Sequence, residues 1–163
     1  MWVRVCSITL LAWATIACHR QFKDPVSVLN MNDDTIERQL LSGFYGVENN
    51  TWRWVRRDFF VTLGPPPGSA ERGAVLEIKF FIPEQQISQL GPVTLTPKIG
   101  LRDLPPMTYS TGGSLQYRAE LLPVEAETNV IPVDFHFDKA VAPTKTDARE
   151  LAAVVSSISI RAL

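Results

Sequence analysis

The sequence predicts an all-β fold, an antiparallel two-sheet β-sandwich of jelly-roll type, preceded by a cleaved signal segment. Twelve prolines in 163 residues interrupt the chain too often for long helices. Short stretches of alternating apolar and polar residues recur along the chain, and turn-rich segments separate them. No intervening segment suits the helix of a βαβ unit, so we expect antiparallel strand pairing.

The composition is that of an ordinary globular protein. Apolar residues make up 45% and charged residues 20% of the chain, which excludes overall disorder. Sixteen Lys and Arg residues oppose seventeen Asp and Glu residues, for a net charge of -1. We expect no nucleic-acid partner, because the chain has no basic excess to neutralise a phosphate backbone.

Residues 1–17 are predicted to be a lipoprotein-type signal peptide. Arg4 is the only charge before Cys18, and an apolar run extends from Val5 to Ala14. This run is shorter than the roughly 20 residues that span a bilayer, so a permanent transmembrane helix is not expected.

The Ala17-Cys18 pair resembles the lipobox of bacterial lipoproteins, in which a small residue precedes the cysteine that becomes the lipidated first residue. The resemblance implies acylation of Cys18, palmitate included, and a lipoprotein anchored in the cell envelope at the periplasmic face or outer membrane. The only other cysteine is Cys6, so the exported part has no internal disulfide to form. The alternative is an ordinary signal peptide that is cleaved nearby.

The exported chain divides into a tether and one domain. Residues 18–34 are predicted to be the lipidated cysteine and a polar tether, and residues 35–163 the β-sandwich domain. Thr35 to Leu41 is too short for periodicity to decide between an extended segment and a helical turn capped by Asp34, and we expect the extended form.

Strand patterns dominate from Gly43 onward. The segment Asp58 to Leu63 is aromatic and β-branched, and it ends at a Gly-Pro-Pro-Pro-Gly stretch that no strand continues through. In Ala74 to Pro83, apolar residues alternate with Glu77 and Lys79, as in a sheet buried on one side. Four more strands are predicted at Val93–Ile99, Ser114–Leu122, Val130–Phe137 and Ala153–Arg161.

No catalytic or metal-binding set can be assembled from the sequence. After Cys18 the chain offers only His19 and His136 as imidazole ligands, too few for a zinc site. No Ser-His-Asp or Cys-His set is plausible, and Gly112-Gly113 suits a hairpin turn better than an anion-binding loop. We therefore expect a non-enzymatic protein without a cofactor. A hydrolase with two catalytic carboxylates is a weaker alternative, since nothing singles out a pair.

The aromatic residues are the most informative candidates. Trp52 and Trp54 are two positions apart, so on a strand both face the same side, with Arg53 opposite. Two indoles on one face can belong to the core, because each buries on the order of 200 Å². They can also form a platform for the apolar faces of pyranose rings, with Glu48 and Arg53 near enough to bind hydroxyl groups.

A second polar group precedes the last strand. Asp147 and Arg149 can pair locally or meet charges from elsewhere, because a guanidinium fork suits a carboxylate or a carbonyl. The structural alternative is a capped turn that leads into the last strand.

Together these groups resemble an uncharacterised bacterial β-sandwich domain that is often attached to glycosyltransferases or lies beside surface-polysaccharide genes. The matching motifs are Gly43-Phe44-Tyr45, Glu48, Trp52-Arg53-Trp54 and Asp147-Ala148-Arg149-Glu150-Leu151. The resemblance implies a jelly-roll-like sandwich associated with surface glycans, with Glu48, Arg53, Trp54, Asp147 and Arg149 at the matching positions. It implies no catalytic residue.

Two functions fit these observations. The first is a membrane-anchored, non-enzymatic module that binds carbohydrate through Glu48, Trp52, Trp54 and their neighbours. The second is a structural or accessory lipoprotein subunit that binds a protein of an envelope complex.

We expect the mature chain to begin at an acylated Cys18. Mass spectrometry of the N-terminal peptide checks this prediction, because several acyl chains add a mass that ordinary signal cleavage does not. A mature chain that keeps Met1, or that carries an unmodified Cys18, contradicts it.

Overall fold

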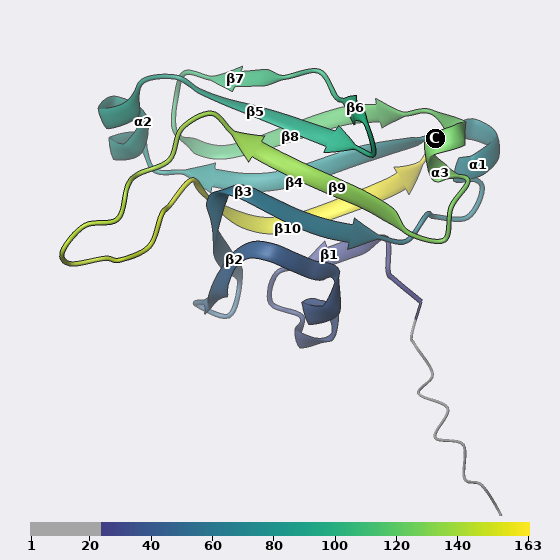
Figure 1. Ribbon diagram of the computed structural model, residues 1–163, viewed down its shortest axis with the longest axis horizontal. Helices are drawn as coiled ribbons and strands as arrows, with labels where there is room; N and C mark the ends of the chain where they lie inside the picture. The colour runs from purple at the N-terminus through teal and green to yellow at the C-terminus, as the bar shows by residue number, and fades with distance from the viewer. Residues whose placement is uncertain (1–23) are drawn as a thin grey trace, which may run out of the picture.

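The computed structural model describes residues 24–163, which form a curled antiparallel β-sheet with a few short helices (Figure 1). Every strand pair in this part of the chain is antiparallel, which confirms the all-β, antiparallel class. The strands are β1 (Val28–Asn30), β2 (Leu40–Glu48), β3 (Trp52–Leu63), β4 (Ala74–Ile82), β5 (Val93–Ile99), β6 (Arg102–Asp103), β7 (Met107–Tyr109), β8 (Gly113–Leu121), β9 (Ile131–Phe137) and β10 (Ala153–Ala162). The helices are η1 (Asp34–Gln39), α1 (Ser69–Arg72), α2 (Glu84–Leu90) and α3 (Pro123–Ala126).

Strand β3 connects the two halves of the sheet. One edge of β3 pairs with β2, from Glu48↔Trp52 to Leu40↔Val61. Its two other partners, β10 and β9, therefore share the opposite edge. Along that edge, residues 53–55 pair with β10, and residues 58–63 pair with β9. The strand therefore leaves the half formed by β10, β4 and β8 and joins the half formed by β9, β5, β6 and β7.

The core fills the space between these halves. Phe80 of β4 and Phe137 of β9 lie far apart in the strand order, yet their ring centroids are 5.6 Å apart. Phe59 of β3 stacks on Phe135 at 4.8 Å and lies 6.1 Å from Phe137. These contacts require a sheet that curls over a shared interior, and they bury large aromatic surfaces there.

Two tyrosines join β8 to residues 105–109, the segment that contains β7. The Tyr109 hydroxyl donates to the Gln116 carbonyl at 3.0 Å, and the Tyr117 hydroxyl donates to the Pro105 carbonyl at 2.8 Å. Burial raises the pKa of Tyr117 to about 12, so its proton remains available for this bond at neutral pH.

Five predicted strands correspond to β4, β5, β8, β9 and β10, with ends that agree within one residue. The sixth, Asp58 to Leu63, is the second half of a longer strand, since β3 begins at Trp52. The alternation in β4 and β5 matches their burial, because each places every second side chain in the core.

The N-terminal part differs from the sequence interpretation in two places. Residues 28–30, which the sequence interpretation assigned to the tether, form β1 and pair with β10. In this pairing Val28 lies opposite Ser159 and Asn30 opposite Ser157. The prediction of an extended Thr35 to Leu41 is wrong for residues 35–39, which belong to the 3-10 helix η1. Its cap is Asp33, whose carboxylate accepts the Thr35 N–H at 2.8 Å.

The expected hairpin turn at Gly112-Gly113 is also wrong. Strand β7 pairs with β5 and β8 pairs with β4, so residues 110–112 cross between the two halves of the sheet. Gly112 lies against the first turn of α2, where its N–H donates to Glu84 at 2.7 Å. A Cβ at Gly112 would lie 2.7 Å from backbone atoms of Glu84, so the crossing requires glycine.

Gly43 lies where β3 changes partners. From the Ser42↔Phe60 pair to the Phe44↔Val55 pair, β3 contains more residues than β2, so β3 carries a large bulge there. Gly43 has a φ of 82°, and a Cβ there would lie 2.3 Å from the Asp58 carbonyl oxygen. This close approach holds β2 against β3 at its bend.

We expect Gly43→Ala to lower the free energy of unfolding by about 2 kcal/mol or more, because it adds a strained φ and a steric overlap. Chemical denaturation followed by tryptophan fluorescence measures the change. Gly46→Ala is the matched control on the same strand, since a Cβ at Gly46 meets nothing within 4 Å. Its effect should stay within about 1 kcal/mol, and equal losses in both variants would contradict the assignment.

Candidate functional site

Trp52 and Trp54 lie on the outer face of the sheet, as the sequence alternation predicts. Trp54 pairs with Val154 of β10, Val154 with Phe81 of β4, and Phe81 with Ser114 of β8. Residues in register across antiparallel strands share one face, so these four side chains form a row over four strands. Both tryptophans are half-buried and therefore present part of each indole to solvent.

A groove of about 760 Å³ follows this face. Its size is within the range of pockets that hold small ligands, and its floor is mostly apolar. Phe81 is 42% exposed, an unusual value for a large aromatic ring outside a binding surface. The lining residues are Glu48, Trp52, Trp54, Lys79, Phe80, Phe81, Pro83, Ser114, Leu115, Gln116, Val154 and Ser156.

Polar groups of both charges border the apolar floor. The Lys79 ammonium lies 3.4 Å from the carboxylate of Glu77, which is nearly buried. Glu77 also accepts a hydrogen bond from the Gln116 amide at 2.8 Å and lies 3.5 Å from Arg118. Glu77 therefore fixes Lys79 and Gln116, which both line the groove.

Glu48 stands at the end of the groove where β2 turns into β3. The turn bonds Thr51 N–H to the Glu48 carbonyl at 3.1 Å, and Asn49 and Asn50 have φ values of 49° and 53°. Asparagine tolerates this left-handed backbone better than most residues, which suits a tight hairpin. The turn brings Glu48 directly opposite Trp52.

Arg53 lies on the opposite face, as the alternation predicts, and does not line the groove. Only 6% of Arg53 is exposed. Its guanidinium bonds the Met31 carbonyl at 3.0 Å, the Tyr45 carbonyl at 3.4 Å and the Glu37 carboxylate. A buried charge with these partners is costly to uncover, so Arg53 holds η1 and β1 to β3.

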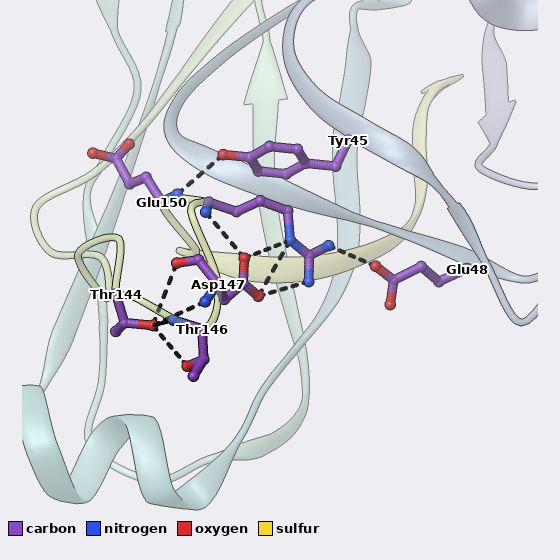
Figure 2. Close-up of polar contacts among 7 residues, drawn as sticks. Tyr45, Glu48, Thr144, Thr146, Asp147 and Glu150 are labelled. Atoms are coloured by element: carbon purple, nitrogen blue, oxygen red, sulfur yellow. Dashed lines mark hydrogen bonds and ion pairs between the residues drawn. The ribbon is translucent and has the colours of Figure 1, made fainter.

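Asp147 and Arg149 lie in the long loop between β9 and β10, drawn in yellow-green in Figure 1. Arg149 donates to both oxygens of Asp147 and, through Nη1, to Glu48 Oε1 at 2.7 Å (Figure 2). Asp147 also accepts the Arg149 N–H at 3.0 Å, which forms a local turn. Arg149 thus makes both kinds of contact that the sequence allowed, a local pair with Asp147 and an ion pair with the distant Glu48.

The ring of Tyr45 packs against the ion-pair cluster of Glu48, Asp147 and Arg149. The Arg149 guanidinium lies 5.5 Å from the Tyr45 ring centroid, within cation–π range. The Tyr45 hydroxyl accepts the Glu150 N–H at 3.0 Å, as Figure 2 shows. The cluster therefore ties the loop before β10 to the end of β2.

The cluster also sets the ionisation of its members. Hydrogen bonds from the Arg149 guanidinium and N–H lower the pKa of Asp147 below its usual value. Hydrogen bonds to Asp147 and Glu48 raise the pKa of Arg149 further above its ordinary value. Both shifts favour the charged forms of Asp147 and Arg149.

The structure brings Glu48, Trp52 and Trp54 together in the groove and joins Asp147 and Arg149 to it through Glu48. It leaves Arg53 apart, on the opposite face of β3. Sequence reasoning missed the contributions of β4 and β8, among them Lys79, Phe81 and Gln116. One signal existed, because Phe81 puts an aromatic ring on the polar side of an alternating strand.

Residues 24–163 contain no group of three or more His, Cys, Asp or Glu side chains placed to hold a metal ion. Within the same range, no helix is long and apolar enough to cross a membrane. Cys18 and the predicted signal peptide lie outside the described residues.

No family model and no curated protein sequence matches the chain. Among solved structures that match, one titled "CBM4 structure and function" is 10% identical in sequence. The match covers 82% of this chain and 84% of that chain, with a TM-score of 0.33. A likeness at this level says nothing about function.

We expect Arg149→Gln to raise the pKa of Asp147 toward its usual value, because the guanidinium that stabilises the carboxylate is lost. In the native chain, the lowered pKa stabilises the fold above the ordinary Asp pKa, and this contribution disappears as pH falls through the folded value. Carboxyl NMR titration of both proteins measures the shift. Arg57→Gln, a nearby exposed arginine that does not contact Asp147, is the control. An unchanged Asp147 titration in Arg149→Gln would contradict the assignment.

Proposed function

We propose that this protein is a membrane-anchored, non-enzymatic envelope lipoprotein whose β domain binds carbohydrate in the groove along Trp52 and Trp54. The domain is, in this proposal, a two-sheet sandwich of jelly-roll type. The observation that carries the proposal is the row of half-exposed aromatic rings on one sheet face, bordered by hydrogen-bonding side chains.

The chemistry of the groove supports a sugar ligand. Pyranose rings present apolar C–H faces that pack on aromatic rings, and Trp52, Trp54 and Phe81 offer three such surfaces. Hydroxyl groups need donors and acceptors nearby, and Glu48, Lys79 and Gln116 supply both kinds. An open groove on a sheet face suits a chain of sugar units, because both ends of the ligand can extend beyond it.

Anchorage supports a glycan at the cell surface as the ligand class. An acylated Cys18 would hold the domain on an envelope membrane, where polysaccharides are abundant and a weak module is concentrated near its ligand. The alternative is that the groove binds a protein, because a groove of this size also accommodates an aromatic or aliphatic side chain of a partner. The binding experiment below distinguishes the two.

We expect Trp54→Ala to weaken glycan binding by at least about tenfold, equivalent to about 1.4 kcal/mol, because it removes one stacking surface. Glycan-array screening identifies a ligand for the full-length protein, and calorimetry with that glycan measures the affinity. Leu41→Ala, at an exposed apolar position outside the groove, is the control and should bind as the native protein does.

Absence of binding to any glycan, or binding that is indifferent to Trp54→Ala, counts against a sugar site in this groove. Cross-linking from intact cells then distinguishes the alternative, since a stable protein partner without sugar affinity supports an accessory subunit. Unfolding curves for both variants show whether a loss of glycan binding results from a less stable fold.

A further inference from the structure

We propose that the end of the domain opposite the groove docks on the lipid bilayer, so that the groove faces away from the membrane. This inference rests on the proposed lipid anchor at Cys18. It concerns four side chains that we call the apolar end: Leu101, Leu122, Val124 and Leu163.

These four are the most exposed large apolar side chains among residues 24–163. Leu101 is 99% exposed, Val124 66%, Leu122 54% and Leu163 52%. Single exposed apolar residues are ordinary on a protein surface, but a group gathered at one end marks an interaction site.

Strand register places two of the four, Leu122 and Leu163, at one end of the sheet. Ala74 pairs with Leu121 of β8 and with Ala162 of β10, so Leu122 and Leu163 follow at the same end of the sheet, on the two strands that flank β4. The Leu163 N–H donates to the Gly73 carbonyl at 3.2 Å, just before β4. Figure 1 shows the C-terminus, α1 and α3 together at this end.

Leu101 reaches the same end from the other half of the sheet. It occupies the turn between β5 and β6, and Arg102 beside it bonds both oxygens of Glu125 at 2.6 Å. Glu125 follows Val124 in α3, so this pair holds Leu101 near Val124. The pair also cancels two charges at this site, and the Arg102 hydrogen bonds lower the pKa of Glu125.

The groove lies at the other end of the same strands. Phe81 pairs with Ser114 and Val154 in the groove, whereas Ala74 pairs with Leu121 and Ala162 at the apolar end. Strands rise about 3.3 Å per residue, so roughly 26 Å separates the two ends of β8.

The chain enters the described domain on the side of the apolar end. The Gly64 N–H, just after β3, donates to the Val26 carbonyl at 3.0 Å, and Leu63 pairs with Ile131 near the start of β9. Six residue-to-residue steps separate Cys18 from Asp24, a distance of at most about 22 Å. An acyl chain on Cys18 would therefore keep the apolar end close to the bilayer and limit how far the domain can turn.

The partner is the hydrocarbon and headgroup boundary rather than anionic lipid charge. Both charge signs occur around the apolar end, with Glu71 beside Arg72 and Arg102 paired with Glu125. Docking through Leu and Val side chains depends on buried apolar area. Neutral phosphatidylcholine vesicles are therefore the appropriate probe.

The test uses the full chain, produced with its signal and reconstituted in phosphatidylcholine vesicles. Leu101→Cys and Val124→Cys carry an environment-sensitive maleimide dye, and Ser110→Cys, an exposed site near the groove end, is the matched control. We expect both apolar-end dyes to shift to shorter emission wavelength and to become several-fold less accessible to aqueous iodide, with the Ser110→Cys dye unchanged.

The outcomes separate the docking from the anchor. The parent chain should not react with maleimide, because an acylated Cys18 has no free thiol, and a reactive parent overturns both the anchor and the docking. An unreactive parent with equal quenching at all three positions overturns the docking alone. Shielding that declines as fewer protein molecules occupy each vesicle identifies a second copy of the chain as the occupant and also overturns the docking.

Discussion

The partner exchange along β3 is the constraint on which the rest of the structure depends. One continuous strand hydrogen-bonds β10 over residues 53–55 and β9 over residues 58–63, so the backbone itself holds the two halves in a fixed relation. The bend needs β2 to follow at close range, and Gly43 permits it because no Cβ stands between the strands. By alternation along this strand, the indoles of Trp52 and Trp54 lie outside and the ring of Phe59 lies inside, where it stacks on Phe135 of β9. Groove and core therefore arise from one path of the chain.

The sequence patterns predicted those strands whose inward-facing and outward-facing positions follow from the strand's own residues. In β4 and β5, every second residue points inward because of its own position in the alternation, whatever the strand pairs with. The elements that were missed or misassigned depend on distant partners. Strand β1 exists because β10 offers it an edge, and the 110–112 crossing exists because β7 and β8 belong to different halves of the sheet. Short elements of this kind carry too few residues for a period to show.

The candidate site divides in the same way. The two tryptophans could be placed on one face from their spacing alone, and Arg53 on the other. Lys79, Phe81 and Gln116 come from strands adjacent to β10 or β4, so their place beside Trp54 follows only from the strand order. The bond between Glu48 and Arg149 joins positions about a hundred residues apart, and local reasoning could assign Arg149 a partner only within its own turn.

The tyrosine contacts between β7 and β8 have a consequence for association between copies of the chain. Strand β8 pairs only with β4 among the described strands, so its other side offers backbone groups to any passing extended segment. The phenol of Tyr109 occupies the Gln116 carbonyl, and Tyr117 links the neighbouring position to Pro105. A foreign strand would have to displace these side chains before it could extend the sheet. These side chains thereby protect the free side of β8 against pairing with a strand of another copy of the chain.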